Sequence, residues 1–457
     1  MITGAIGSIL DAIGGTPLVR LNRIAADVPA RVHVKCEYLN PAGSAMDRLA
    51  LHLVNQAETR GDLAPGHTII AATTGNTGAS LAMVCATRGY PCVFVVPDGV
   101  AEEKVAALRA YGARVVVCPA AVEPDDPRSF HAVAKRLAAD IPNGFLADQY
   151  TSPDNPEAHH ASTGPEIWEQ TGGDIDVFVA GLGTGGTMMG VGRFLRERKP
   201  DIKLVGVDPV GSVYYDFAKF GRVAKPLTYK LEGLGQDFFP PTLDLGLLDE
   251  VVRVDDRDAF LTTRALVRLE GIHAGGSSGA AVAGALQYAR RTGAEGNIVV
   301  LLPDGAARYL SKIFNDDWMR ENGFLAEEEG LGVVADLLQG KSSEVIIAKS
   351  TDRVRDVISR MKAHGISQLP VLEDGRLIGA VAEVDLLRYL VSGEQSLASP
   401  IGPIVESDYA TVSVGTRIDE LQGLLADARM AIVMDGERVS GVVTKIDLID
   451  YLARRAS

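Results

Sequence analysis

The stretch VFVAGLGTGGTMMGVGRFLRER, residues 177–198, combines three features in an informative order. A short β-branched run comes first, a glycine-rich turn follows, and a helical run ends the stretch. Glycines such as Gly185 and Gly186 leave backbone N–H groups bare at the start of a helix, where the helix dipole also favours negative charge. The turn therefore suits a phosphate group, although a single glycine-rich turn is a weak signal of a ligand site.

Strand-like runs of the same kind recur along the first 300 residues. They are found at 32–34, 93–96, 115–117, 177–180, 204–207 and 298–302. Helical stretches separate them, and this alternation predicts an α/β protein with buried parallel strands and crossover helices. A content of 49 glycines and 6% aromatic residues agrees with many tight strand-to-helix turns. At 457 residues the chain exceeds one ordinary core, so we expect two or three domains.

Three further motifs accompany the glycine-rich turn. NPAGSAMDR occupies residues 40–48, TTGNTG occupies 73–78 and GGSSG occupies 275–279. In this order and spacing, between residues 13 and 319, the motifs resemble those of the fold-type II pyridoxal phosphate enzymes, in particular cystathionine β-synthase and cysteine synthase. The resemblance implies a two-lobed α/β domain of the tryptophan synthase β type at residues 1–325. It also implies pyridoxal 5′-phosphate as cofactor and a small amino acid as substrate.

The resemblance assigns the contacts of the cofactor to these motifs. The glycine-rich loop would hold the phosphate, Asn76 would hydrogen-bond the 3′ oxygen, and Ser277 would meet the pyridine nitrogen as a neutral partner. A neutral partner weakens the electron sink and favours β-elimination over transamination or racemisation. Without the resemblance, Ser277 is equally a small residue in a tight turn. The implied phosphate residues are Gly183, Thr184, Gly185, Gly186 and Thr187, and the implied substrate-carboxylate residues are Thr73, Thr74, Thr77 and Gln149.

The motif at residues 40–48 departs from the family pattern at one decisive position. Met46 stands where the resemblance places the lysine that holds the cofactor as a Schiff base and removes the α-proton of the substrate. A thioether can do neither. Because a positioned general base contributes roughly 10²- to 10⁴-fold, or about 3 to 5 kcal/mol of barrier, we expect ordinary β-replacement to be severely impaired. We also expect the cofactor to be bound non-covalently.

Other positions of the same expected pocket also depart from the family pattern. Gln236 replaces a tyrosine within EGLGQDF, Ala71 replaces an acidic residue, and His273 occupies a usually aliphatic place. Because a histidine side chain ionises near neutrality, His273 is a candidate substitute base, although a hydrogen-bonded histidine that fills a gap explains it as well. Lys35 and Lys104 are the nearest other amines. Family members that keep the catalytic lysine also have lysines there, which argues against a substitute role.

The last part of the chain contains an internal repeat. GRLIGAVAEVDLL is echoed by ERVSGVVTKIDLI, so that Asp385 and Asp447, 62 residues apart, are equivalent. Such a duplication predicts two halves that pack on one another. It resembles the α+β Bateman module, a pair of CBS repeats. The predicted bounds are 326–340 for a linker, 341–457 for the module, and about 341–395 and 398–457 for its repeats.

The resemblance to a Bateman module implies an adenosyl ligand. In such modules a [Ser/Thr]-x-x-Asp sequence ends each repeat, and the aspartate binds the ribose hydroxyls. Thr444 and Asp447 satisfy this pattern, whereas Ala382 precedes Asp385 in the first repeat. The expected ligand, S-adenosylmethionine or an adenine nucleotide, would therefore favour the second repeat. A purely structural or dimerising pair of repeats is the alternative.

Charge and composition restrict the partners. The net charge of −14 argues against nucleic acid and anionic membranes, because both attract basic surfaces. The four cysteines lack the spacing of a metal site, so we expect buried, reduced thiols and no metal. No signal peptide and no membrane-spanning run are recognisable, which favours a cytoplasmic protein. We further expect a homodimer or a larger homo-oligomer.

Different classes of function remain at this point. The leading hypothesis is a cystathionine β-synthase-like protein that performs altered β-elimination or β-replacement on a serine- or cysteine-like amino acid. The rival hypothesis is a catalytically inactive pseudoenzyme that senses an adenosyl ligand or binds a partner. A third is an active β-synthase whose lysine has been changed to methionine in order to trap an intermediate.

Overall fold

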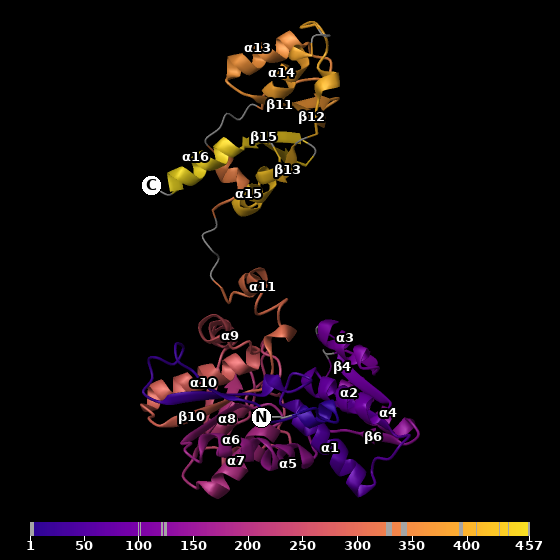
Figure 1. Cartoon of the computed structure of the whole chain (residues 1–457), viewed down its shortest axis with the longest axis vertical. Coiled ribbons are helices and arrows are strands. Elements are labelled where there is room, and N and C mark those ends of the chain that lie inside the picture. The colour runs from indigo at the N-terminus through magenta and orange to yellow at the C-terminus, as the bar shows by residue number, and fades with distance from the viewer. Residues whose placement is uncertain are drawn as a thin grey trace. The chain divides into compact units, whose positions relative to one another are not determined.

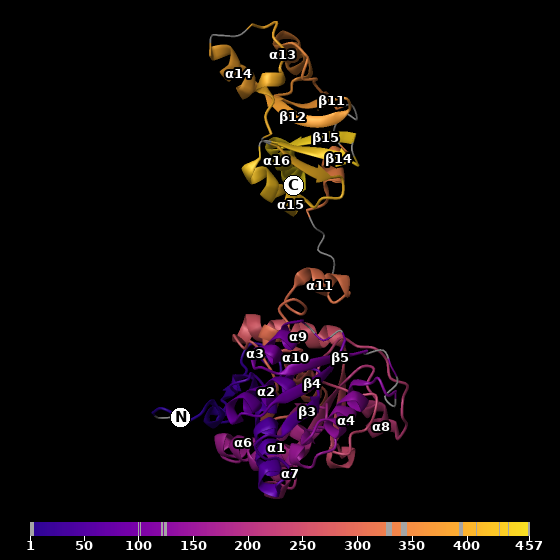
Figure 2. The ribbon, with the colours of Figure 1, turned by 90° about the vertical axis from the view of Figure 1, so that its right-hand side faces the viewer.

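The chain forms two compact units, Met1–Leu325 and Ala326–Ser457. Figures 1 and 2 show their elements in two views. The computed structural model describes residues 4–98, 100, 102–119, 122, 126–325, 331–339, 345–392, 396–407, 409–428, 430–436 and 438–455. Each unit has its own hydrophobic cores and is described by itself.

The first unit alternates strands and helices. Its strands are β1 (Leu18–Arg20), β2 (Arg31–Cys36), β3 (Thr68–Ala72), β4 (Cys92–Pro97), β5 (Arg114–Cys118), β6 (Gly144–Leu146), β7 (Val177–Gly181), β8 (Lys203–Pro209), β9 (Glu250–Val254) and β10 (Asn297–Leu302). Its helices are α1 (Met46–Arg60), α2 (Asn76–Arg88), α3 (Glu102–Ala110), α4 (Phe130–Asp140), α5 (Asp154–Ala161), α6 (Thr163–Thr171), α7 (Gly186–Arg198), α8 (Tyr214–Phe220), α9 (Asp256–Glu270), α10 (Gly276–Thr292) and α11 (Asp316–Glu321). Short 3₁₀ helices lie at Ile9–Ala12, Glu37–Leu39, Leu245–Leu247 and Ala306–Arg308.

Two sheets give the first unit its two lobes. The larger sheet has the strand order β1-β2-β10-β7-β8-β9 and is parallel except at β1. The smaller sheet has the order β5-β4-β3-β6 and is entirely parallel. Every β-branched run singled out in the sequence lies in one of these strands. The prediction of a two-lobed α/β domain is therefore confirmed.

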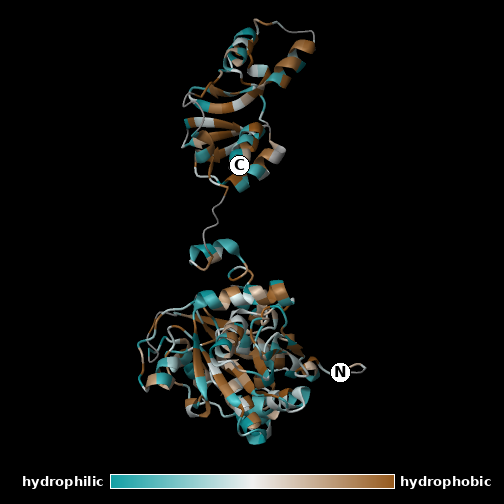
Figure 3. Ribbon diagram, turned by 90° about the vertical axis from the view of Figure 1, so that its left-hand side faces the viewer, coloured by the Kyte–Doolittle hydropathy of each residue, from teal (hydrophilic) through white to brown (hydrophobic). Residues whose placement is uncertain are grey.

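Both faces of the central strands of each sheet are buried, which explains why these strands read as continuous apolar runs. In the larger sheet, Val179 joins the core beneath α10, whereas its neighbour Phe178 joins the core beneath α7. In the smaller sheet, Val95 and Phe94 divide in the same way between two cores. Figure 3 shows the mainly hydrophobic colouring of these strands. Met46 packs against a core of each lobe and so lies between the two sheets.

The second unit contains two similar halves. Its elements are α12 (Val334–Leu338), α13 (Val354–His364), β11 (Gln368–Glu373), β12 (Arg376–Ala382), α14 (Glu383–Val391), β13 (Ala410–Ser413), α15 (Ile418–Asp427), β14 (Met430–Asp435), β15 (Arg438–Thr444) and α16 (Lys445–Arg455), with a 3₁₀ helix at Gly402–Ile404. The pairs β11–β12 and β14–β15 are antiparallel, and their registers shift after Val371 and Val433, at the offset of the sequence repeat. Ala380 of one half shares a core with Ile432 of the other. Figure 2 shows the helices on the outer sides of the two sheets. The predicted α+β module of two mutually packed repeats is confirmed.

The stretch 326–340, interpreted above as a linker, is described only at residues 331–339. There α12 forms, and Val334 and Leu337 are buried in the same core as Ile418 and Val443. Residues 334–338 are therefore part of the second unit rather than a free connection. The sequence pattern did not reveal this because a five-residue helix shows too little periodicity.

Three general expectations concern membranes, thiols and metals. No helix in the described part of the chain is both long enough and apolar enough for a bilayer crossing. Cys36, Cys85, Cys92 and Cys118 are buried and not in disulfides. Among the described residues, no group of three or more His, Cys, Asp or Glu side chains is placed to hold a metal ion.

Candidate functional site

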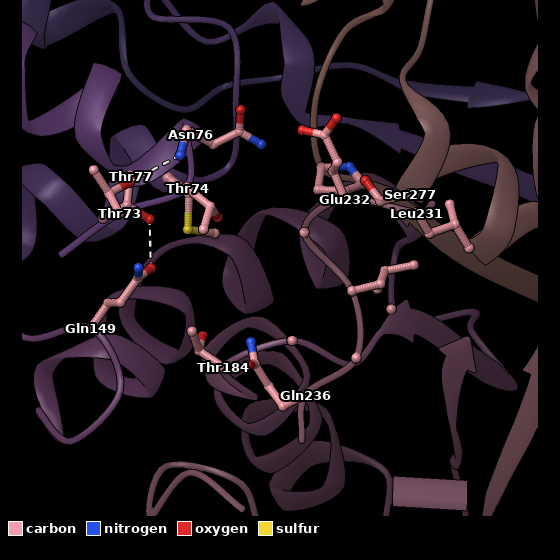
Figure 4. Close-up of a pocket in the computed structure, with 18 of the residues that line it drawn as sticks. Thr73, Thr74, Asn76, Thr77, Gln149, Thr184, Leu231, Glu232, Gln236 and Ser277 are labelled. Carbon is pink, nitrogen blue, oxygen red and sulfur yellow. Dashed lines mark hydrogen bonds between the residues drawn. The ribbon is translucent and has the colours of Figure 1, made fainter. Parts of the chain in front are cut away.

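A cavity of about 510 Å³ lies in the first unit and collects the motifs described above. Its walls come from the starts of α1, α2, α7 and α10, from the segment 229–236, and from residues after β10. Figure 4 shows the labelled side chains arranged around this space. The sequence-predicted residues that line it are Met46, Thr73, Thr74, Asn76, Thr77, Gln149, Gly183, Thr184, Gly185, Gly186, Thr187, Gln236 and Ser277.

The loop between β3 and α2 forms one wall. Its shape depends on Thr73, whose Oγ1 accepts hydrogen bonds from the N–H groups of Gly75 at 3.1 Å and Gly78 at 3.0 Å. The hydroxyl of Thr77 donates to Oε1 of Gln149 at 2.6 Å. Thr73, Thr77 and Gln149 are buried, whereas Thr74 is exposed. The wall thus offers hydroxyl and amide groups suited to a small polar ligand.

The glycine-rich loop between β7 and α7 forms a second wall. Gly185 has a φ of +85°, a left-handed conformation that favours glycine, and a Cβ at Gly186 would lie 1.8 Å from Oδ1 of Asn155. Nδ2 of Asn155 donates to Oγ1 of Thr184 at 2.9 Å and to the carbonyl of Gln149 at 2.7 Å. This buried asparagine therefore holds both walls together. Because the first N–H groups of a helix lack intrahelical acceptors, the start of α7 is a suitable site for an anion such as phosphate.

Met46 is the first residue of α1, and its half-buried side chain lines the cavity. Its N–H donates to Oγ of Ser44 at 3.3 Å. Two residues after Met46, Arg48 anchors the helix through a bidentate contact with Glu37, at 2.7 and 2.9 Å. It also donates to Glu166 at 2.7 Å. The backbone at position 46 is thus firmly held, but the side chain carries no group that can accept or donate a proton.

Glu166 contributes to this anchor as a charged group. Burial disfavours its ionised form, but the hydrogen bonds and charges of Arg48 and Lys35 outweigh burial and lower the pKa of Glu166 to about 2. Nζ of Lys35 donates to Glu166 at 2.8 Å, to Gln170 at 2.9 Å and to the carbonyl of Thr16 at 2.6 Å. Lys35 therefore belongs to a buried structural network and does not line the cavity.

His273 also lies away from the cavity, so its assignment as a candidate base needs correction. Its side chain is exposed, and its ring centroid is 5.9 Å from that of Phe314. Ile272 and Ala274 on either side are buried, so the backbone turns the intervening side chain outward. Proximity in sequence to Ser277 was misleading because the chain changes direction at the start of α10.

Ser277 and Gln236 do line the cavity. Ser277 is buried in the first turn of α10. The N–H of Gln236 donates to Oγ of Ser212 at 3.1 Å, and its carbonyl accepts from Val213 at 3.1 Å. Figure 4 shows the Gln236 side chain beside Thr184, on the wall of the glycine-rich loop.

A charged cluster of Lys104, Glu232 and Lys312 also lines the cavity. Lys104 was singled out in the sequence as one of the nearest other amines, whereas its pairing with Glu232 was not predicted. Glu232 forms ion pairs with buried Lys104 and, at 2.8 Å, with Lys312. Nζ of Lys104 also lies 4.9 Å from the ring centroid of Tyr309. Burial disfavours the ionised Glu232, but the two lysines outweigh burial and lower its pKa. Glu232 belongs to the EGLGQDF stretch, which was noted in the sequence for Gln236 and not for its charged residue.

The aspartates of the second unit cap helices. Oδ2 of Asp447 accepts from the N–H and the hydroxyl of Thr444, at 2.7 and 2.6 Å. In the first half, Oδ2 of Asp385 accepts from the N–H of Ala382 at 3.0 Å. The two positions thus have the same geometry, and Thr444 adds the hydroxyl that Ala382 lacks.

Comparison with known families matches both units. Residues 9–304 match the family described as pyridoxal-phosphate dependent enzymes. Residues 334–392 and 401–454 match the CBS domain.

Individual proteins are similar over most of the chain. Cystathionine beta-synthase of Dictyostelium discoideum is 36% identical over 464 residues, covering 98% of this chain and 92% of that protein. Cystathionine beta-synthase of Mus musculus is 35% identical over 483 residues, covering 98% and 86%. Among solved structures, O-ureido-L-serine synthase is 38% identical with a TM-score of 0.63, covering 69% of this chain and 100% of that chain. A hydrogen sulfide-producing enzyme from Fusobacterium nucleatum is 33% identical with a TM-score of 0.62, covering 67% and 99%.

Proposed function

Because the chain belongs to the cystathionine β-synthase family of pyridoxal-phosphate-dependent enzymes, with a C-terminal pair of CBS domains, we propose that it binds pyridoxal phosphate non-covalently in the cavity described above. One observation carries this proposal. The glycine-rich loop, the threonine-containing loop and Met46 line a single cavity, in which position 46 offers no amine.

The cavity residues fit this cofactor. A Cβ at Gly186 would overlap Asn155, so this position requires glycine. Because glycine has no side chain, the N–H groups at the start of α7 stay uncovered, which supports binding of the phosphate. Asn76 would hold the 3′ oxygen, and Ser277 would face the pyridine nitrogen as a neutral partner. When bound, pyridoxal phosphate supplies an electron sink for negative charge at the Cα of an amino acid.

The proposed substrate is a serine- or cysteine-like amino acid. Thr73, Thr77 and Gln149 would bind its carboxylate through hydroxyl and amide groups, together with Thr74, which is exposed and lines the same cavity. The proposed reactions are altered β-elimination or β-replacement, because the leaving group of such a substrate is attached at Cβ.

The residue at position 46 should limit the rate of the proposed reaction. We infer that it replaces the lysine that accepts the α-proton in related enzymes. Without a base at this position, proton removal should be slower by roughly 10²- to 10⁴-fold. A pseudoenzyme is the second candidate, favoured by the ion pairs that already engage Lys104 and Lys312 with Glu232.

The second unit is proposed to bind S-adenosylmethionine or an adenine nucleotide. The support is the Thr444–Asp447 arrangement, which presents a hydroxyl and a carboxylate together at the start of α16. A regulatory effect would require the ligand to favour one arrangement of the chain over another.

A titration distinguishes enzyme from pseudoenzyme. Protein loaded with pyridoxal phosphate is mixed separately with serine, O-acetylserine, cysteine and homocysteine, and the absorbance of the cofactor and the released product are followed. We expect one amino acid to change the absorbance and to yield product slowly. Retained cofactor with neither change would contradict the enzymatic proposal and favour the pseudoenzyme.

A further inference from the structure

Asn76, at the start of α2, has both ends of its side-chain amide engaged by residues that follow β10. Its Nδ2 donates to Oδ2 of Asp304 at 2.8 Å, and its Oδ1 accepts from Nη1 of Arg308. Asp304 is fully buried, and its Oδ2 also accepts from the hydroxyl of buried Tyr309 at 2.6 Å. The short 3₁₀ helix Ala306–Arg308 therefore connects directly to the threonine-containing wall of the cavity.

This pair of contacts permits one orientation of the amide. After a 180° flip, the carbonyl oxygen of Asn76 would face the carboxylate of Asp304, and its NH₂ group would face the guanidinium of Arg308. Both new contacts would pair groups of the same polarity, so the flip would lose two charge-assisted hydrogen bonds. Because an amide nitrogen carries two hydrogens, one N–H remains for a ligand, and its direction is fixed.

The fixed amide is part of the cavity wall. Asn76 lines the cavity, and Figure 4 shows its side chain extending from the threonine-containing loop toward the wall that carries Glu232 and Ser277. Arg308 itself is not among the described lining residues, so it acts on this space through Asn76.

We propose that Arg308 is a positioning residue that directs the free N–H of Asn76 toward the 3′ oxygen of pyridoxal phosphate. This inference rests on the proposed function. It adds a residue that no motif of the chain indicated, located on the turn where the sequence reads PDGAARY.

Arg308 also has a purely structural contact that must be separated from this role. Its Nη2 donates to the carbonyl of Ala42, in the segment that leads to α1. Loss of Arg308 could therefore loosen the cavity as a whole. A loosened cavity would bind every cofactor analogue less tightly, whereas a misdirected Asn76 would affect only a compound that has the 3′ oxygen.

The test is a comparison of two ligands by absorbance and fluorescence titration of the full chain. One is pyridoxal phosphate, and the other is its analogue without the 3-hydroxyl group, which therefore lacks the 3′ oxygen. The variants are Arg308→Met, Arg308→Lys, Asn76→Ala and the double variant of Arg308→Met with Asn76→Ala. Lys312→Met is the matched control, since it removes a cavity cation that does not contact Asn76. Thermal melting checks that each variant is folded.

We expect the native protein to prefer pyridoxal phosphate over the analogue by about three- to tenfold, the value of one hydrogen bond to a neutral donor. Arg308→Met should bring this ratio close to one, as should Asn76→Ala, and the double variant should lose no more than either. Arg308→Lys should restore part of the ratio, and Lys312→Met should keep it.

Two results would overturn the inference while leaving the proposed function intact. In the first, Arg308→Met binds both ligands as tightly as the native protein does. In the second, it weakens both ligands by the same factor, so that the ratio stays native, which would show a structural role only. If the native protein retains neither ligand, the proposed function fails and this inference fails with it.

Discussion

Replacement of Met46 by lysine is the perturbation whose consequences follow most directly from the cavity. Methionine and lysine are both unbranched, so the substitution needs no change at the start of α1. The apolar stem of lysine can keep the contacts that Met46 makes with the cores of the two lobes. A cation in the first turn of a helix is disfavoured by about 0.3–1 kcal/mol, which leaves the folded state intact.

The gain in transition-state stabilisation should be larger than this cost. A positioned base contributes about 3 to 5 kcal/mol, so Met46→Lys should raise the rate of β-replacement by roughly 10²- to 10⁴-fold. The assay measures product formation from serine and homocysteine, with Met46→Gln as the control of similar length. Borohydride treatment and peptide mass analysis then locate any cofactor bound covalently to the protein.

A covalent adduct at residue 46 together with the faster rate would agree with the proposed position of Met46 beside the cofactor. An unchanged rate, or a loaded variant without an adduct at residue 46, would refute it. Full activity restored by this one substitution would favour the hypothesis that the chain is an active β-synthase whose lysine has been changed to methionine. A partial gain would indicate that Gln236 and the other departures in the pocket had also changed the site.

Further predictions concern the phosphate loop, the anchor of α1 and the second unit. Gly186→Ala should weaken pyridoxal phosphate binding and destabilise the fold by about 1–3 kcal/mol, because the new Cβ would overlap Asn155; an unchanged dissociation constant in the cofactor titration would contradict this. Glu166→Gln should cost about 2–3 kcal/mol of unfolding free energy at neutral pH. Because the folded pKa of Glu166 is lowered, its contribution is fully present above the unfolded value of 4.5 and is lost as the pH falls toward 2, so denaturant unfolding curves of the two proteins should converge between pH 5 and pH 2. Asp447→Asn should weaken S-adenosylmethionine binding in calorimetry by about tenfold or more, whereas Asp385→Asn should have a smaller effect; equal effects would argue against a preferred second repeat.

Most of the fold was predictable because both faces of its central strands are buried. Such strands consist of apolar, β-branched runs that stand out in the sequence. The strands β1, β3, β6 and β9 were not singled out in the sequence. β1 and β6 each have three residues and no buried one, so they leave little apolar signal. Residues 334–338 were assigned to a linker because their helix is stabilised by contacts with Ile418 and Val443, far along the chain.

The site was predictable only where its residues occur in short motifs. The glycine-rich loop and the threonine-containing loop each form locally, so their sequences indicate their shapes. Contacts between distant segments gave no such signal, as with Glu232 and Lys104 or Arg308 and Asn76. His273 was wrongly predicted to face the site because it is near Ser277 in the sequence. Nearness along the chain does not determine which way a side chain points.

The most direct test of the central claim is an absorbance titration of the native protein with pyridoxal phosphate, followed by gel filtration, borohydride treatment and peptide mass analysis. We predict a saturable cofactor band that elutes with the folded protein. Denaturation should release the cofactor from the chain, and borohydride treatment should yield no cofactor-modified lysine. A protein that retains no cofactor, or that yields a modified lysine such as Lys104, would contradict non-covalent binding in this cavity.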